Sequence, residues 1–330
     1  MKTKFNCTLI ALALSATISL FSCKNETEVI SQLATPSSIG FNHIRQKALE
    51  DISIKKGFKA EEGLEFTTDK GTKIKIPSNC LLDNNNTLVT GEVTLSFVEM
   101  YDRGNMVITN KPLMGKNENG DLLPLITGGQ FNIEVYKNNQ KLRAGCPFYV
   151  NIPADLTGGL DSDMKLWFGN IDEEGNLTWE EVTGEGNQGK RAGITPNSDY
   201  ATYDIWSNEF GWTNVDRFAG EPDPKAQIKV TVPAAYNHTN SAVYLSYENE
   251  RNLLARLDIY DSQEHFFTEH YGFLPVGKNV HIIFTSESNG SIVYAIKKVT
   301  IAPNAIFNIS ENELALTSKE NLINQINNLN

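Results

Sequence analysis

Between Phe66 and Cys146, short stretches of alternating apolar and polar residues are separated by polar turns. In the segments 93–97 and 131–135 every second residue is apolar, which is the period of a β-strand with one buried face. The turns at 83–86 and 117–121 are rich in Asn, Asp and Gly, which favour tight turns. This region therefore predicts a compact all-β module of the sandwich type.

The segment 72–76 shows the same alternation and stops at Pro77. Because proline has no N–H to donate to a neighbouring strand, we predict an edge strand at this position. The same criteria predict three further strands, at 148–152, 164–168 and 177–179, of which the last two form a hairpin.

The segment 200–218 is rich in large aromatic residues, and the segment 184–199 before it is rich in Gly and Asn, which predicts an exposed loop. A buried core between two domains is the preferred interpretation, because large aromatic side chains bury the most area. The alternative is a surface platform for a ligand, since exposed Trp206 and Trp212 would suit the apolar face of a sugar ring. The five aromatic residues are Tyr203, Trp206, Phe210, Trp212 and Phe218.

A proline-rich stretch, 221–224, predicts a domain boundary. Beyond it, five strand-like segments predict a second, smaller sandwich that is Ig-like in strand count only. Short helices with one apolar face are predicted at 42–56 and from residue 317 onward. The predicted fold class is therefore all-β, with two β-sandwich domains and short helices near both ends. The five segments are 228–232, 243–247, 256–260, 280–285 and 292–301.

The first residues have the features of a secretory signal peptide. Lys2 and Lys4 provide a charged start, and the apolar run 9–20 is too short to span a bilayer as a resident helix. The sequence Leu20-Phe21-Ser22-Cys23 then resembles the lipobox of bacterial lipoproteins. This resemblance implies cleavage before Cys23, acylation of its thiol and of the new amine, and stable anchoring to a membrane by several acyl chains.

Acidic residues follow the predicted lipidation site, in Lys24-Asn25-Glu26-Thr27-Glu28. This pattern resembles the surface-export signal of Bacteroidetes lipoproteins, and an ordinary solvated tether is the alternative. The predicted location is therefore the outer membrane, with the body facing either the periplasm or the outside.

Two cysteines are left once Cys7 is removed with the signal peptide and Cys23 carries lipid. Cys80 and Cys146 both flank strands of the first module, and the cell envelope is oxidising. A disulfide between them is one prediction. Two small buried thiols are the alternative, because cysteine is among the most buried residue types.

Four motifs of the first module resemble the ZU5-like domains of Bacteroidetes lipoproteins. They are Thr68-Asp69-Lys70-Gly71-Thr72 to Ile76-Pro77, Val89-Thr90-Gly91-Glu92-Val93, Met100-Tyr101-Asp102-Arg103-Gly104 and Gly128-Gly129-Gln130-Phe131. The resemblance covers about Gly63 to Ala144, with a further similar segment at 208–218. It implies a β-sandwich with a structural or protein-interaction role. Self-cleavage, known in some eukaryotic ZU5 domains at a His-Phe-Ser step, is not implied, because residues 63–144 contain no histidine.

The predicted organisation has five parts. They are a signal peptide at 1–22, a lipidated tether with a short helix at 23–57, a ZU5-like sandwich with a hairpin extension at 58–220, a second sandwich at 221–316 and a helix at 317–330.

The formal charge of −11 and the lack of basic clusters argue against nucleic acid as a partner. His265 and His270 are the nearest approach to a metal motif, but residues five apart do not converge on one ion from a helix or a strand. The acidic residues at 161–174 lack calcium-loop spacing, and the glycine-rich run 184–191 lacks both the Ser or Thr of a P-loop and a following helix. No metal, cofactor or catalytic residue is predicted.

The function predicted from the sequence is that of a lipid-anchored, non-catalytic cell-envelope protein with a structural or protein-interaction role. Its partner is an unknown envelope protein or a glycan. A carbohydrate-binding accessory protein is one alternative, which would show Trp206 or Trp212 exposed in a groove. An envelope hydrolase is another, which would show converging carboxylates or a Ser/His pair in a pocket.

Overall fold

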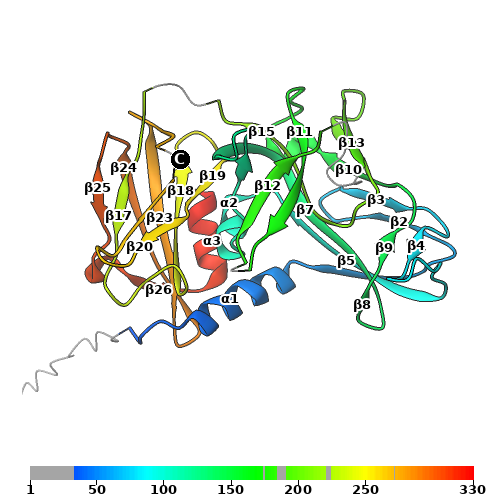
Figure 1. The fold of residues 1–330 in the computed structure, drawn as a ribbon, viewed down its shortest axis with the longest axis horizontal. Helices are drawn as coiled ribbons and strands as arrows, with labels where there is room; N and C mark the ends of the chain where they lie inside the picture. Colours follow the sequence, from blue (N-terminus) through cyan, green and yellow to red (C-terminus); the bar gives the residue numbers. More distant parts are fainter. Residues whose placement is uncertain (1–32, 174, 184–190, 221–223, 271) are drawn as a thin grey trace, which may run out of the picture. The chain divides into compact units, whose positions relative to one another are not determined.

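The structure is a computed structural model that describes residues 33–173, 175–183, 191–220, 224–270 and 272–330. Residues 34–330 form one compact unit (Figure 1). Strands dominate the described residues and helices are few, which confirms the all-β class. Within this part of the chain, no helix is both long and apolar enough to cross a bilayer.

Two sheets make up most of the chain before residue 221. An eight-stranded sheet has the order β1-β5-β7-β15-β11-β12-β6, with β8 beside β7. A five-stranded sheet, called the outer sheet below, has the order β13-β14-β10-β3-β2. The bounds of the first sheet are β1 (Ile54–Lys59), β5 (Glu92–Met100), β6 (Met114–Lys116), β7 (Leu122–Lys137), β8 (Gln140–Lys141), β11 (Lys165–Ile171), β12 (Leu177–Glu181) and β15 (Gly211–Phe218). Those of the outer sheet are β2 (Leu64–Thr67), β3 (Lys73–Ile76), β10 (Phe148–Pro153), β13 (Ala192–Asn197) and β14 (Thr202–Ser207).

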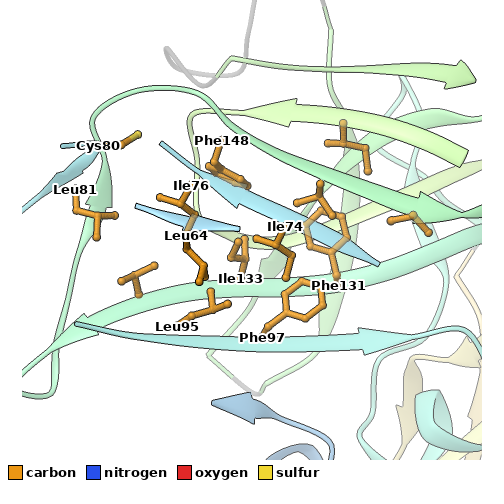
Figure 2. Packing of buried hydrophobic residues seen from close by; sticks show 14 of the residues in the cluster. Leu64, Ile74, Ile76, Cys80, Leu81, Leu95, Phe97, Phe131, Ile133 and Phe148 are labelled. Atoms are coloured by element: carbon orange, nitrogen blue, oxygen red, sulfur yellow. The ribbon is translucent and has the colours of Figure 1, made fainter. Parts of the chain in front are cut away.

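A hydrophobic cluster joins these two sheets. Leu95, Phe97 and Ile133 belong to the eight-stranded sheet, and Ile74 and Phe148 belong to the outer sheet, yet all lie in one cluster (Figure 2). The predicted alternation is the reason, because β3 and β10 bury every second side chain and leave the others exposed or half-buried. Burial of these aliphatic and aromatic side chains stabilises the pair of sheets by about 1.5–3 kcal/mol for each residue fully removed from water.

Two predictions in this region are wrong. The segment ending at Pro77 is not an edge strand, since β3 pairs with both β2 and β10. Pro77 follows the last strand residue, so its missing N–H removes no hydrogen bond from the ladder. Composition predicts a loop at residues 192–197, but these residues form β13. Their backbone hydrogen bonds go to β14, and the composition of a segment does not show which strand it will pair with.

The chain after residue 224 forms further sheets. A five-stranded sheet has the order β19-β18-β23-β24-β26, and a four-stranded sheet has the order β20-β21-β17-β25. The predicted strand 256–260 is divided at Asp258 between β19 and β20, which belong to different sheets. The bounds are β17 (Lys229–Thr231), β18 (Ser241–Tyr247), β19 (Leu254–Leu257), β20 (Ile259–Asp261), β21 (Phe266–Thr268), β23 (Asn279–Ser288), β24 (Ser291–Thr300), β25 (Ile306–Asn308) and β26 (Ala315–Thr317). Two short pairs are β4 (Leu81–Leu82) with β9 (Arg143–Ala144), and β16 (Lys225–Ala226) with β22 (Leu274–Pro275).

Within the described residues, three α-helices and two 3-10 helices accompany the sheets. Helix α1 begins earlier than predicted because the hydroxyl of Ser37 accepts a hydrogen bond from the backbone N–H of Gly40 and so caps its first turn. It also ends before Ile54, where β1 begins. Helix α2 was not predicted. The helices are α1 (Ser38–Asp51), α2 (Arg103–Ile108) and α3 (Lys319–Asn327), with 3-10 turns at Ala154–Thr157 and Glu311–Glu313.

A second hydrophobic cluster contains side chains from both sides of residue 221. Met106 of α2 and Leu322 of α3 lie in it, together with Trp212 of the eight-stranded sheet and Tyr244 and Ile283 of the C-terminal five-stranded sheet. These helices therefore contribute to a core shared by the two halves. The division of the chain into two sandwich domains stays a prediction, and residues 221–223 of its predicted boundary at 221–224 lie outside the described residues.

Candidate functional site

The outward face of the outer sheet carries an ordered arrangement of aromatic and polar side chains. One row crosses all five strands in register, from Glu65 through Lys75, Tyr149 and Trp206 to Gly193. Strand alternation places all five residues on the same side, because their strand neighbours point into the hydrophobic cluster. We call this surface the outer face.

The centre of this row is an exposed aromatic pair. Tyr149 and Trp206 are directly opposite each other on β10 and β14, and they are 46% and 39% exposed. Opposite side chains on antiparallel strands have Cβ atoms about 4.5–5.5 Å apart, so the two residues are neighbours on this face of the sheet. A Cβ on Gly193 would lie 2.5 Å from Nε1 of Trp206, so the indole lies against the backbone of β13 at a position where any side chain would displace it.

A polar row lies beside the aromatic pair, with Asp204 at its centre. Its Oδ1 accepts hydrogen bonds from Nδ2 of Asn151 at 2.6 Å and from the hydroxyl of Thr202 at 2.7 Å. Its Oδ2 accepts one from Nδ2 of Asn197 at 2.7 Å. Partial burial opposes ionisation, but these three donors and the charge of Lys73 together lower the pKa of Asp204. The carboxylate is therefore charged at neutral pH and fixed in place.

One end of the aromatic row, formed by Glu65 and Lys75, is charged. Nζ of Lys75 lies 2.5 Å from Oε1 of Glu65, and both side chains are well exposed. Two residues beyond Trp206, Asn208 lines a cavity of about 300 Å³ with Glu209, Phe210 and Arg143. The outer face thus combines two flat apolar rings with fixed donors and acceptors, a combination typical of sites that orient a ligand by a few polar groups.

The predicted aromatic residues separate into buried and exposed ones. Tyr203 and Trp212 are buried in the two hydrophobic clusters, as expected for a core, and Phe210 and Phe218 pack against those clusters. Trp206 is the exposed member. Trp212 is therefore not a surface ligand platform, and Tyr149 takes that place beside Trp206. Sequence reasoning missed Tyr149 because it lies in a different strand, and only the antiparallel register brings the two together.

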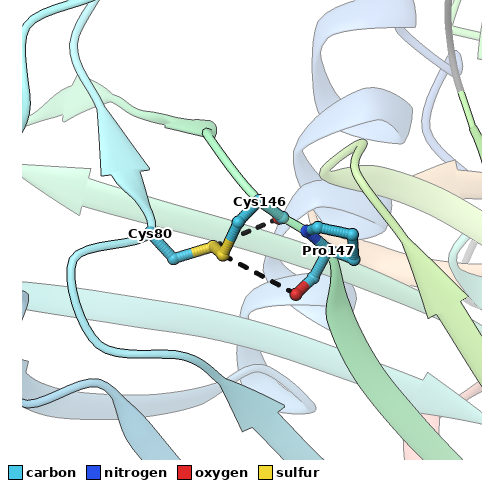
Figure 3. The surroundings of a disulfide bond; sticks show 3 residues. All are labelled: Cys80, Cys146 and Pro147. Carbon is cyan, nitrogen blue, oxygen red and sulfur yellow. Dashed lines mark hydrogen bonds between the residues drawn. A yellow bond between two sulfur atoms is a disulfide. The ribbon is translucent and has the colours of Figure 1, made fainter.

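Cys80 and Cys146 are joined by a disulfide (Figure 3). The bond connects the residue before β4 to the loop that enters β10 through Pro147, and their Cα atoms are 5.2 Å apart. Tyr149 follows Cys146 by three residues. The disulfide therefore holds the start of the strand that carries one half of the aromatic pair.

The other residues considered for chemistry have separate structural partners. Nδ1 of His265 lies 2.9 Å from the hydroxyl of Tyr260, whereas Nδ1 of His270 lies 3.3 Å from Oδ2 of Asp258. Asp161 forms an ion pair with Arg217 at 2.7 Å. Among the residues that the structure describes, no group of three His, Cys, Asp or Glu side chains could hold a metal ion. Cys23 and most of the run 184–191 lie outside the described residues.

A second cavity, of about 510 Å³, bears on the hydrolase alternative. Asp155 and Glu250 line it together with Arg103 and Arg251. The guanidinium of Arg103 is already engaged, since it donates to the hydroxyl of Ser246 and, at 2.8 Å, to the backbone oxygen of Leu329. Asp155 and Glu250 are the carboxylates of this cavity that a hydrolase would use. The outer face, by contrast, combines exposed aromatic rings with a hydrogen-bonded carboxylate.

Comparison of the chain with models of known protein families and with curated proteins finds no match.

Proposed function

We propose that this protein is a lipid-anchored, non-catalytic protein of the cell envelope whose outer face binds a glycan. The exposed pair of Tyr149 and Trp206 is the observation that carries the proposal. Flat aromatic rings stack on the apolar C–H faces of sugar rings and exclude water there. The neighbouring polar groups supply hydrogen bonds to sugar hydroxyls.

The composition of the outer face supports a neutral, hydroxyl-rich ligand. The carboxylate of Asp204 is an acceptor for hydroxyl groups, and its three donors keep it from turning away. Lys75 and Glu65 neutralise each other at one end of the row. An extended sugar chain that crosses the sheet would have ring contacts at the centre of the row and polar contacts at its Glu65 end.

The anchor is part of the same proposal. It rests on the resemblance of Leu20-Phe21-Ser22-Cys23 to the lipobox and on the charged and apolar residues before it. A body tethered by acyl chains at the outer membrane would present the outer face to glycans, either in the periplasm or on the cell surface.

A protein partner is the second candidate, in keeping with the ZU5 resemblance of residues 63–144. Tyrosine and tryptophan also concentrate in the energetic centres of protein interfaces, so the same aromatic pair would suit this role. The two candidates differ in the chemistry of the molecule that the pair contacts.

Replacing the aromatic pair tests the glycan proposal. We expect Trp206→Ala and Tyr149→Ala each to weaken binding to a neutral oligosaccharide by roughly 2- to 12-fold, because a stacked aromatic contact contributes about 0.5–1.5 kcal/mol beyond burial of area. The measurement is titration calorimetry with the oligosaccharides that the wild-type protein retains on a glycan array.

Two further variants make this experiment specific. Gly193→Ala keeps both rings but displaces the indole, and it should weaken binding as Trp206→Ala does. Tyr200→Ala removes an exposed aromatic residue from the turn between β13 and β14, outside the pair, and should leave affinity unchanged. Retention of no glycan by the wild-type protein would exclude this ligand class, and equal affinity of Trp206→Ala and wild type would exclude the outer face.

The anchor has its own test. We expect Cys23→Ala to move the protein from the membrane fraction to the soluble fraction, because no thiol is then left at that position to accept the acyl chains. Fractionation of cells followed by immunoblotting measures this change. Cys7→Ala is the matched control, since Cys7 lies within the predicted signal peptide, and membrane-bound Cys23→Ala protein would contradict the proposal.

A further inference from the structure

Three positively charged side chains from distant parts of the chain come together near the second hydrophobic cluster. Arg45 lies on α1, Lys111 follows α2, and Arg256 lies on β19. Lys111 and Arg256 are only 6% and 7% exposed. Arg256 lowers the pKa of Arg45, and both arginines lower the pKa of Lys111, so the three side chains lie within electrostatic range of one another.

Two of these cations, Arg45 and Arg256, have unused hydrogen-bond donors. Nη2 of Arg45 and Nε of Arg256 are buried and have no acceptor within the described part of the chain. The other contacts of these residues satisfy only part of each group. The Arg45 guanidinium lies 3.9 Å from the centre of the Phe41 ring, and Nζ of Lys111 lies 5.5 Å from that of the Trp212 ring. Among the described residues, no carboxylate forms an ion pair with any of the three.

A cavity of about 320 Å³ gives access to this cluster. Arg45 and Lys111 line it, together with Asn42, Gln46, Thr109 and Asn110. Asn110 is held in place because its Oδ1 accepts a hydrogen bond from the buried hydroxyl of Tyr244 at 2.7 Å. Glu173 also lines the cavity, and its side chain is exposed. The buried part of the cavity is thus positively charged and rich in donors.

Burial and mutual repulsion are costly for such groups. Removal from water is the larger cause, and repulsion by the neighbouring arginines adds to it, so the pKa of Lys111 falls to about 8. For Arg45, removal from water is again the larger cause and Arg256 adds to it, which lowers its pKa to about 10. Buried charges in proteins are normally paired, and an anion in the cavity would supply the missing partner.

We infer that this cavity is a binding site for a small oxyanion, a phosphate or carboxylate group, held by Arg45 and Lys111. Both side chains suit this chemistry, since a guanidinium donates through several N–H groups and an ammonium acts as a point charge. The site is separate from the outer face and does not depend on the glycan proposal. Arg256 is not among the residues that line the cavity, but its charge acts on both Arg45 and Lys111, while its Nη1 donates to Oδ1 of Asn176.

Thermal unfolding of the full chain with inorganic phosphate, acetate or chloride at matched ionic strength tests this site. We expect phosphate or acetate to raise the unfolding midpoint more than chloride does, because a ligand that binds only the folded state stabilises it. The anion with the larger effect identifies the phosphate or the carboxylate class. Equal effects of all three salts would overturn the inference.

Variants then assign the effect to the cavity. Lys111→Met should weaken binding of the effective anion roughly tenfold or more, as measured by calorimetry, because it removes a charged donor. It should also raise the unfolding midpoint in chloride alone, because one unpaired buried charge is lost. Lys116→Met, at an exposed lysine nearby in sequence, is the control and should change neither quantity.

Arg45→Gln provides a second route if Lys111→Met does not fold. It removes the guanidinium whose Nη2 has no acceptor among the described residues, and Lys47→Gln on the same helix is its exposed control. We expect anion binding to be lost in Arg45→Gln and kept in Lys47→Gln. Full anion binding by a folded Lys111→Met or Arg45→Gln protein would overturn the assignment.

Discussion

Loss of the Cys80–Cys146 disulfide should lower the free energy of unfolding by about 2–4 kcal/mol. The bond closes a loop with a sequence separation of 66 residues, and a loop of that length restricts the unfolded chain strongly. Urea unfolding of Cys80→Ala/Cys146→Ala against the oxidised wild type measures the difference. Alanine is chosen because Cys80 is buried, where a serine hydroxyl would add an unsatisfied polar group.

Reduction of the wild-type protein provides the control for this experiment. Treatment with a thiol reductant should lower the unfolding free energy of the wild type and leave the double variant unchanged. A peptide map of the unreduced protein should show the two cysteine-containing peptides linked. Two free thiols at these positions, or an unfolding free energy that does not respond to reductant, would contradict the prediction.

Replacement of the buried carboxyl of Asp216 should stabilise the protein at neutral pH. Asp216 lies on β15 with no exposed surface, and removal from water raises its pKa well above the ordinary value of 3.8. The side chain of Asn214 donates to Oδ2 at 2.5 Å, but Oδ1 has no hydrogen-bond partner within the described residues. The folded state therefore favours the protonated, neutral carboxyl.

The sign of the pH dependence follows from this shift. Because the folded protein holds this proton more tightly than the unfolded chain does, the contribution of Asp216 is fully present below pH 3.8. It is lost as the pH rises from there through the folded-state pKa, at about 1.4 kcal/mol per pH unit. Asp216→Asn is neutral at every pH and keeps the shape of the side chain, so this loss does not occur in the variant.

Urea unfolding of wild type and Asp216→Asn across pH 4 to pH 8 tests the prediction. The variant should be the more stable protein at pH 8, and its advantage should shrink toward pH 4. Every other group titrates in the same way in both proteins, so the difference between their unfolding free energies reports the titration of residue 216 alone. A variant that is less stable by the same amount at every pH would show that Asp216 is not held neutral in the folded state.

The sequence by itself determined the all-β class and most of the strands. The apolar residues at every second position of 93–97 and 131–135 predict β5 and part of β7, because one face of each strand must be buried. The positions of Cys80 and Cys146 left two interpretations open, a disulfide or two buried thiols, and the structure contains the disulfide. The strands depend on residues close together in the chain, and the disulfide hypothesis depends on the number of cysteines, so neither prediction needs knowledge of contacts between distant segments.

Only the tertiary structure decided which residues form the candidate sites. Tyr149 and Trp206 are 57 positions apart in number, and antiparallel register alone places them opposite each other. The Arg45, Lys111 and Arg256 cluster joins a helix, a loop and a strand, and no spacing in the sequence predicts it. The same limit explains the wrong edge strand at 72–76, since pairing partners come from distant segments. Composition and periodicity determine which face of a strand is buried, but the contacts between segments determine what the other face can bind.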